Sequence, residues 1–344
     1  MGIKEQKMNP TENTNPNKLT ESEAGEARVI IDKLSKAYAK KVVGQDELRL
    51  SMVVALIAGG HVLLESVPGL AKTLAAKTLA EAANGSFSRI QCTPDLLPSD
   101  IIGTQIYNYN SGDFDTKVGP VHANFVLLDE INRSSAKTQS AMLEAMQEHQ
   151  VTVGGVLYKM PEPFIVLATQ NPIEQEGTYE LPEAQLDRFL LKEIVSYPSR
   201  DEEMQILNYI LSGQTTAPLS ENEKISIDEV KKLQTLAKKV AVDDSIKNYI
   251  VNITTASRNP RELIDASLAR YVEYGVSPRG AIALMQVSQA LALIDGRAYV
   301  TPDDVKRLRY AALRHRIILN FEAAADEVHP EAIIDAIFNK IQTP

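Results

Sequence analysis

Cysteine, histidine and long apolar runs are scarce in this sequence, and each scarcity excludes a class of protein. The single cysteine, Cys92, cannot form an intramolecular disulfide or a cysteine-based zinc site, which fits a reducing compartment and predicts a cytoplasmic location. The five histidines are scattered without the spacing of metal ligands. The most apolar window, Met52 to Leu64, has only thirteen residues and is interrupted by glycines and a histidine, so we expect no direct membrane insertion.

Positive charge is also in short supply. The 344 residues include 36 lysines and arginines against 45 aspartates and glutamates, which gives a formal net charge of −9. An acidic chain repels phosphate backbones, so nucleic acid is not the expected partner, although a local basic groove is compatible with this balance. At this length the chain can form two domains, each with its own core.

Composition and turn residues divide the chain into four parts. Residues 1–17 are polar and rich in asparagine, which predicts a disordered leader. Helix, strand and turn patterns then alternate over 18–212, as in an α/β nucleotide-binding core. The polar stretch 213–225 lacks periodicity and is interpreted as a linker. The rest, 226–344, is predicted to be a helical lid domain, with helices over 227–240, 244–257, 260–274, 279–293, 302–315 and 330–341.

A phosphate-binding loop is indicated by LLESVPGLAKT, residues 63–73. An apolar strand ends in a Pro-Gly turn, and Lys72 and Thr73 begin a helix whose N-terminus would face an anion. In the pattern G-x-x-x-x-G-K-[ST] the lysine reaches the outer phosphates and the hydroxyl binds Mg²⁺; here Ser66 and Ala71 replace the two glycines. A plain strand-to-helix turn is the alternative. The candidate nucleotide-binding residues are Val67, Pro68, Gly69, Leu70, Ala71, Lys72, Thr73 and Leu74.

A second informative stretch is FVLLDE, residues 125–130. Its continuous apolar run predicts a strand buried on both faces of a parallel sheet, and the carboxyl end of such a strand is where open α/β sheets bind ligands. Asp129 would hold Mg²⁺ together with Thr73, and Glu130 would orient and deprotonate the attacking water. Two solvated carboxylates are the alternative, which the neighbouring phosphate loop disfavours.

Three further side chains are candidates for the same chemistry. Asn171 follows another buried run, FIVLAT, and would reach the same edge, where it could bond a water or a γ-phosphate; an Asn-Pro turn is the simpler alternative. Arg188 precedes a last strand, and its guanidinium is of the kind that stabilises a phosphoryl transition state. Arg279 begins a helix, where the dipole disfavours a cation, which indicates a role; an ordinary surface arginine at a helix start is the alternative.

Two hairpins are expected as insertions into the alternating pattern. Short runs over 104–107 and 114–117 flank Asn110, Ser111, Gly112 and Asp113, and the runs within 151–159 flank Gly154 and Gly155.

These motifs, in this order, resemble those of the AAA+ ATPases and, within them, the MoxR family. LLESVPGLAKT resembles the Walker A motif, FVLLDEINR the Walker B motif, LATQNP sensor 1, EGTYELPEAQLDRF the arginine-finger segment and VSPRGAIAL sensor 2. The resemblance spans roughly residues 34–315. It implies an α/β fold: a P-loop parallel sheet with flanking helices and two β-hairpin insertions, followed by an all-α lid domain.

The resemblance also implies cofactors, partners and roles. ATP and Mg²⁺ would bind at each subunit interface of a homo-oligomer, expected to be a hexameric ring, with Val43, Gly44 and Gln45 near the adenine. Arg188 would act on the neighbouring subunit's γ-phosphate, and Arg279 would touch the nucleotide of its own subunit. Glu130 and Asn171 complete the candidate catalytic set. The hairpins would face the pore or the substrate.

The implied activity is ATP hydrolysis, from ATP and water to ADP and phosphate, that remodels or activates a protein client. Some members of the family act on partners with von Willebrand factor A domains. Two alternatives stay open: a nucleotide-gated assembly scaffold with little turnover, and a DNA-associated AAA+ motor, against which the acidic charge argues. A P-loop kinase or GTPase fits less well, because neither explains Asn171, Arg188 and Arg279 together.

Overall fold

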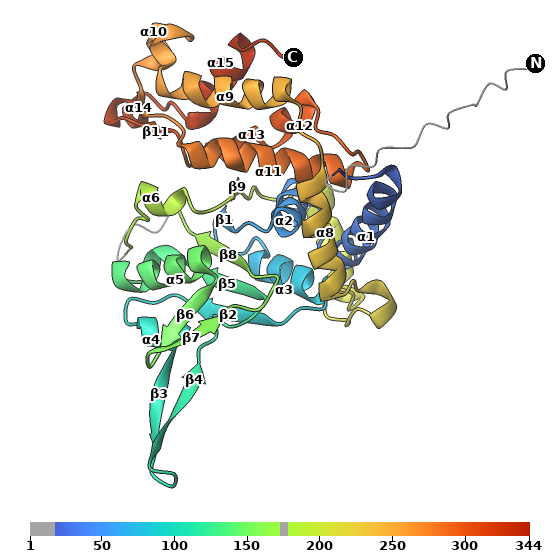
Figure 1. Cartoon of the computed structure of the whole chain (residues 1–344), viewed down its shortest axis with the longest axis vertical. Coiled ribbons are helices and arrows are strands. Elements are labelled where there is room, and N and C mark those ends of the chain that lie inside the picture. Colours follow the sequence, from blue (N-terminus) through green and yellow to red (C-terminus); the bar gives the residue numbers. More distant parts are fainter. Residues whose placement is uncertain (1–17, 173–177) are drawn as a thin grey trace, which may run out of the picture.

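The computed structural model describes residues 18–172 and 178–344. The leader expected over 1–17 lies outside the described residues. A parallel sheet with helices against it occupies the middle of the view in Figure 1, and further helices gather above it. The expected fold class, an α/β core followed by a helical lid, is confirmed.

The central sheet has five parallel strands in the order β2-β5-β8-β1-β9. Its inner strands are continuous apolar runs because side chains on both faces are buried. Leu63 and Val126 face one core cluster, whereas Leu64 and Leu127 face the other. The strands are β1 (Val62–Glu65), β2 (Phe87–Gln91), β5 (Phe125–Asp129), β8 (Ile165–Gln170) and β9 (Leu191–Ile194).

Helices cover both faces of this sheet. One cluster joins the sheet to α1 (Glu21–Ala39), α2 (Asp46–Ala58) and α3 (Lys72–Ala82), and the other joins it to α4 (Pro98–Ile102) and α5 (Ala136–Glu148). Side-chain caps begin two of these helices. Thr20 caps α1, where its hydroxyl accepts the N–H of Glu23, and Ser135 caps α5, where its side chain accepts the N–H of Thr138. The α/β domain also contains η1 (Ile131–Arg133), α6 (Glu183–Leu186) and α7 (Arg200–Leu211).

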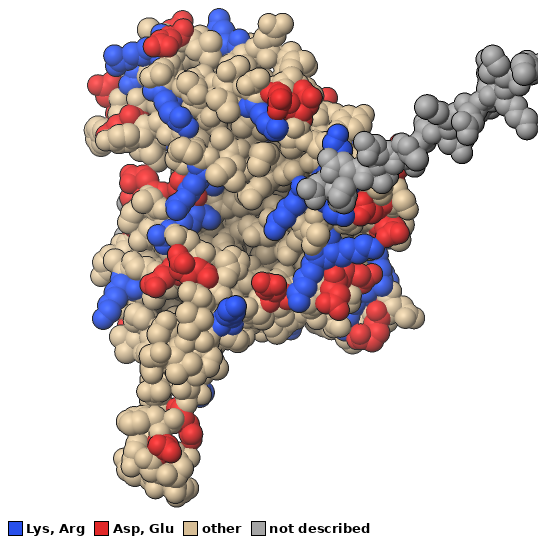
Figure 2. All heavy atoms as spheres, in the orientation of Figure 1, with Lys and Arg blue, Asp and Glu red and all other residues tan. Residues whose placement is uncertain are grey.

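Both expected hairpins are confirmed. The first pairs β3 (Gly103–Asn108) with β4 (Asp113–Val118), and the second pairs β6 (Gln150–Val153) with β7 (Val156–Lys159). The β3–β4 hairpin projects far from the body of the molecule (Figure 1). It leaves Tyr109 and Phe114 exposed, and acidic side chains are visible near its tip in Figure 2.

The C-terminal region is helical, with one local exception. The helix expected over 260–274 is wrong: η3 (Pro260–Glu262), α10 (Ala266–Ala269) and β10 (Val272–Tyr274) stand there, because this backbone pairs with β11 (Ile318–Leu319) and the N–H of Asn320 bonds Tyr271. The helix over 302–315 breaks at Leu308. The helices are α8 (Ile227–Lys239), α9 (Asp244–Arg258), α11 (Pro278–Ile294), α12 (Pro302–Arg307), α13 (Arg309–Leu313), α14 (Phe321–Ala325) and α15 (Pro330–Lys340).

Helix α8 connects the two halves of the molecule. It packs against α1, α2 and α11 through Val230, Leu233 and Leu236. The preceding stretch contains the short helix η2 (Glu221–Glu223), and the boundaries 213–225 for a linker stay a prediction. No helix within 18–172 or 178–344 has the length and apolar character needed to cross a bilayer.

Candidate nucleotide-binding site

The loop between β1 and α3 lies exposed at the carboxyl edge of the sheet. Gly69 has φ +89°, and a Cβ there would meet no atom within 4 Å, so the turn is open to a ligand. Ala71, which stands where the pattern has a glycine, also takes a left-handed conformation with φ +53° directly before α3. The buried hydroxyl of Ser66 donates to the carbonyl of Val67. Ala71 thus adopts a backbone conformation that glycine takes readily, and Ser66 makes its side-chain bond within the loop itself.

Lys72 is held inside this loop. Its Nζ donates to the carbonyl of Ser66 at 3.1 Å. Burial lowers the pKa of Lys72, and the nearby charges of Asp129 and Glu130 oppose that shift. Thr73 follows half-buried in the first turn of α3, where the helix N-terminus favours an anion. Lys72 and Thr73 thus lie together at the start of α3, beside the loop.

The expected adenine segment lies beside the same loop. Gly44 and Gln45 both have positive φ, and the Nε2 of Gln45 donates to the carbonyl of Leu70 at 3.4 Å. Val43 is buried. Glycine is favoured at position 44 because its φ of +63° is one that L side chains rarely adopt, and a Cβ there would also displace the flexible carboxylate of Glu202 in α7. Segments 25 residues apart in the chain therefore form one wall of the candidate site.

Asp129 and Glu130 are oriented by one buried hydroxyl that sequence reasoning missed. Thr169, in β8, donates its Oγ1 hydrogen to Asp129 Oδ1 at 2.8 Å and accepts the N–H of Glu130, also at 2.8 Å. Glu130 has φ +58°, an unusual conformation for a side chain of this size. Thr169 lies within the quoted LATQNP motif, but only strand order brings it beside β5.

Strand β2 supplies two further contacts that the sequence did not indicate. Arg89 donates from Nε at 3.1 Å and from Nη2 at 2.6 Å to Asp129 Oδ2. Gln91 donates to Glu130 Oε2 at 3.3 Å, and Arg133 lies 3.2 Å from the same oxygen. Side chains of the protein itself therefore hold both carboxylates in place. Among the residues the structure describes, His, Cys, Asp and Glu form no cluster of three or more that could hold a metal, so Mg²⁺ would depend on Thr73, Asp129 and the phosphates.

Asn171 reaches the carboxyl edge as expected and is buried. It lines a cavity of about 290 Å³ together with Glu65 and Gln170. Burial alone would raise the pKa of Glu65, but the charge of Lys192, whose Nζ lies 2.7 Å away, and the hydrogen bond from Gln170 lower it overall. The carboxyl ends of β1 and β8 are thus tied together beside the loop.

Arg188 lies at the other edge of the sheet, where the strands begin. It lines a cavity of about 250 Å³ with Gly60 and His61, which precede β1, and with Arg279. Basic side chains are visible below the start of α11 in Figure 2. The Nε of Arg188 is buried and has no hydrogen-bond partner in the described part of the chain. The first two residues of the arginine-finger segment, Glu176 and Gly177, lie outside that part.

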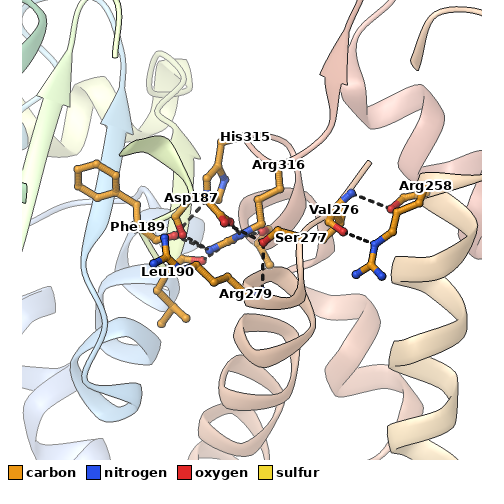
Figure 3. Close-up of polar contacts among 11 residues, drawn as sticks. Asp187, Phe189, Leu190, Arg258, Val276, Ser277, Arg279, His315 and Arg316 are labelled. Atoms are coloured by element: carbon orange, nitrogen blue, oxygen red, sulfur yellow. Dashed lines mark hydrogen bonds and ion pairs between the residues drawn. The ribbon is translucent and has the colours of Figure 1, made fainter. Parts of the chain in front are cut away.

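Arg279 lies beside Arg188 and not beside the phosphate loop. It lines the Arg188 cavity, at the edge opposite Lys72, and its role toward a nucleotide stays a prediction. The reason is local: Ser277, which caps α11 by accepting the N–H of Arg279 at 3.1 Å, also donates to Asp187 Oδ2 at 2.7 Å (Figure 3). This bond fixes the start of α11 beside Arg188.

Two family models match this chain. The model described as the ATPase family associated with various cellular activities (AAA) matches residues 61–191, and the AAA lid domain matches residues 265–337.

Similar proteins of known sequence cover most of the chain. It is 48% identical over 303 residues to the chaperone MoxR1 of Mycobacterium tuberculosis, which covers 88% of this chain and 79% of that one. It is 44% identical over 316 residues to YeaC of Bacillus subtilis, covering 92% and 95%. A crystal structure of a candidate ATPase from Cytophaga hutchinsonii has a TM-score of 0.88 at 44% identity, and the match covers 94% of this chain and 98% of that chain.

Proposed function

This chain belongs to the MoxR family of AAA+ ATPases, and we propose that it hydrolyses ATP in a ring of identical subunits, a hexamer, to remodel or activate a protein client. The observation that carries the proposal is the convergence of Lys72, Asp129 and Glu130 at one sheet edge, with Thr169 joining the two carboxylates. Arginines for a phosphoryl transition state lie at the opposite edge.

Each residue at the loop has a distinct task in this proposal. The loop from Val67 to Thr73 binds the triphosphate through its N–H groups, and Lys72 leaves the Ser66 carbonyl to reach the outer phosphates. Glu130 orients and deprotonates the attacking water, and Asn171 holds that water or the γ-phosphate. Mg²⁺, held by Thr73 and Asp129, supplies positive charge that neutralises the phosphates.

A second copy of the chain completes the site. β1 has four residues, so it spans about 13 Å, and the loop and the Arg188 cavity lie beyond its two ends. The unpartnered Nε of Arg188 supports an acceptor that comes from outside the chain. In the proposed ring, Arg188 and Arg279 both reach the nucleotide of the neighbouring subunit.

Exposed apolar side chains support contacts with other copies and with a client. Helix α7 has no buried residue and exposes Met204, Leu207 and Leu211, which recur at helix spacing on one face. The β3–β4 hairpin exposes Ile106 and Phe114. We assign α7 to the ring and the hairpin to a cytoplasmic protein client, with von Willebrand factor A domain proteins as the proposed client class.

Phosphate release tests the ATPase proposal. Glu130→Gln should retain ATP binding and hydrolyse about 10²–10⁴ times more slowly than the unchanged protein, because it removes the general base. Glu144→Gln, an exposed change on α5, is the matched control and should leave the rate unchanged. Equal background rates for the unchanged protein and Glu130→Gln would contradict the ATPase and favour the nucleotide-gated scaffold.

Assembly and client are tested separately. Light scattering with and without ATP should reveal the ring, and a strict monomer at every concentration would contradict the second-copy mechanism. DNA retention that weakens steeply with rising salt would favour the DNA motor. Glu130→Gln in ATP should retain a von Willebrand factor A domain protein from the same cells; no retention would contradict the client class.

A further inference from the structure

A buried arginine of the lid forms hydrogen bonds to the residues on both sides of Arg188. Arg316, which follows α13, is only 6% exposed. It donates from Nε to Asp187 Oδ1 at 2.8 Å, from Nη2 to the carbonyl of Phe189 at 2.6 Å, and from Nη1 to that of Leu190 at 3.1 Å (Figure 3). Nη2 also donates to the carbonyl of Asp187 at 3.3 Å, so Arg316 restrains the backbone before and after Arg188, whose side chain lines the cavity.

Two other lid residues, Ser277 and His315, contact the same segment. We call Arg316, Ser277 and His315, with their bonds to Asp187, Phe189 and Leu190, the clamp. The hydroxyl of Ser277 donates to the second carboxylate oxygen of Asp187, so that carboxylate is held from two sides. His315 donates from Nε2 to the carbonyl of Phe189 at 3.1 Å, and burial lowers the pKa of His315 well below its usual value, which keeps the ring neutral.

The clamp is attached firmly to the lid. Arg258, at the end of α9, donates from Nε to the carbonyl of Val276 at 2.7 Å, and the N–H of Val276 donates to Ser257 Oγ at 2.9 Å. Val276 directly precedes Ser277 (Figure 3). A rotation of the lid would therefore be transmitted through Ser277 and Arg316 to Asp187.

Burying this charge is not an efficient way to stabilise the fold. Burial lowers the pKa of Arg316, and the charge and hydrogen bond of Asp187 oppose that shift. Buried ion pairs contribute little net stability compared with well-packed apolar residues, and their best-attested benefit is to fix one geometry. Here the fixed geometry is that of Arg188, the proposed trans-acting residue, which stands between Asp187 and Phe189, two residues that Arg316 contacts.

We propose that Arg316 is a positioning residue, supported by Ser277, that sets Arg188 against the neighbouring subunit's ATP and couples the lid to that subunit's hydrolysis. This inference rests on the proposed function, because it needs a ring and an active ATPase. Arg316 touches no reacting atom itself. Loss of the Arg316 side chain should reduce ATP hydrolysis in the neighbouring subunit, while the phosphate loop of its own subunit stays intact.

Mixed rings test the proposal. Arg316→Gln subunits keep their own phosphate loop and Glu130 but do not position Arg188. Glu130→Gln subunits position Arg188 but lack the general base. Each variant alone should hydrolyse ATP at least about tenfold more slowly than the unchanged protein, and Arg316→Gln should bind ATP normally. At equal mixing, about a quarter of the sites combine an intact Glu130 from one subunit with a positioned Arg188 from its neighbour. ATP hydrolysis should therefore rise toward about a quarter of the rate of the unchanged protein.

Matched variants make the outcome decisive. Arg188→Ala mixed with Glu130→Gln is the reference, and Arg316→Gln should recover the same fraction. Arg297→Gln is the control for loss of a lid ion pair, because Arg297 makes two bonds to buried Asp304 within the lid and should affect stability only. If Arg316→Gln loses ATP binding by failing to fold, Ser277→Ala, which leaves Arg316 on Asp187, takes its place in the same assay.

Different outcomes refute the positioning role of Arg316 and the proposed ATPase. Full activity of Arg316→Gln alone, or no recovery when Arg188→Ala does recover, would overturn the positioning role and leave the ATPase intact. Absence of recovery for both mixtures would overturn the trans mechanism itself. For Ser277→Ala, a folded variant with unchanged hydrolysis and unchanged cooperativity would likewise overturn the coupling.

Discussion

Replacement of Thr169 by valine should separate ATP binding from ATP hydrolysis. The Thr169 hydroxyl is buried and makes two bonds of 2.8 Å, one to the carboxylate of Asp129 and one from the N–H of Glu130. Valine has the same shape but no hydroxyl. The variant therefore leaves the Glu130 N–H unpaired and removes one donor from Asp129, whose other oxygen keeps Arg89.

The expected magnitude follows from these two bonds. A bond to a charged group and an unpaired buried N–H each correspond to roughly 1–3 kcal/mol. If about 2 kcal/mol of that is lost from the transition state, kcat falls about 30-fold. Because the Thr169 hydroxyl bonds Asp129 and Glu130 rather than Lys72 or Thr73, ATP affinity should change by less than about twofold. Looser control of Asp129 should also raise the Mg²⁺ concentration for half-maximal activity.

The assay is steady-state phosphate release over a range of Mg²⁺ concentrations, with nucleotide binding measured separately. Thr169→Ser keeps the hydroxyl and should retain most activity. Thr78→Val is the matched control, because the buried Thr78 hydroxyl has no hydrogen-bond partner among the described residues, so its loss should be harmless. A Thr169→Val enzyme with kcat and Mg²⁺ dependence within about twofold of the unchanged protein would refute this reasoning.

Three other variants test the site and the fold. Ala71→Gly should raise thermal stability modestly, by up to about 1 kcal/mol, since it relieves a left-handed alanine, and ATP binding should be kept; destabilisation would contradict the assigned backbone. Arg279→Ala mixed with Glu130→Gln should regain ATP hydrolysis, because we propose that Arg279 acts on the neighbouring subunit. No gain would indicate that Arg279 acts on the nucleotide of its own subunit. Burial holds the pKa of His61 at about 4, below its usual 6.5, so the unfolded chain takes up a proton that the folded chain does not, and stability should fall as the pH falls from 6.5 toward 4. Thermal unfolding of His61→Gln should show a shallower fall over that range, whereas exposed His122→Gln should behave like the unchanged protein.

Local patterns were enough to predict the sheet, the hairpins and the loop. A continuous apolar run with turn residues at its end specifies a buried strand without reference to distant residues, so β1, β5 and β8 were predicted within a residue or two. The positions of Lys72, Asp129 and Asn171 followed, because the ends of parallel strands meet at one edge. The failure over 260–274 has the opposite cause, since pairing with β11 overrode the local helical pattern.

By itself, the sequence determined which chemical groups this protein has and which of them end a strand, because those depend on neighbours in the chain. Only the tertiary structure decided which groups meet. Strand order brought Thr169 and Arg89 to Asp129, and the docking of the lid put Arg279 beside Arg188 and Arg316 against Asp187. Contacts between residues 40 to 129 positions apart depend on how whole elements pack, and no local periodicity encodes that packing.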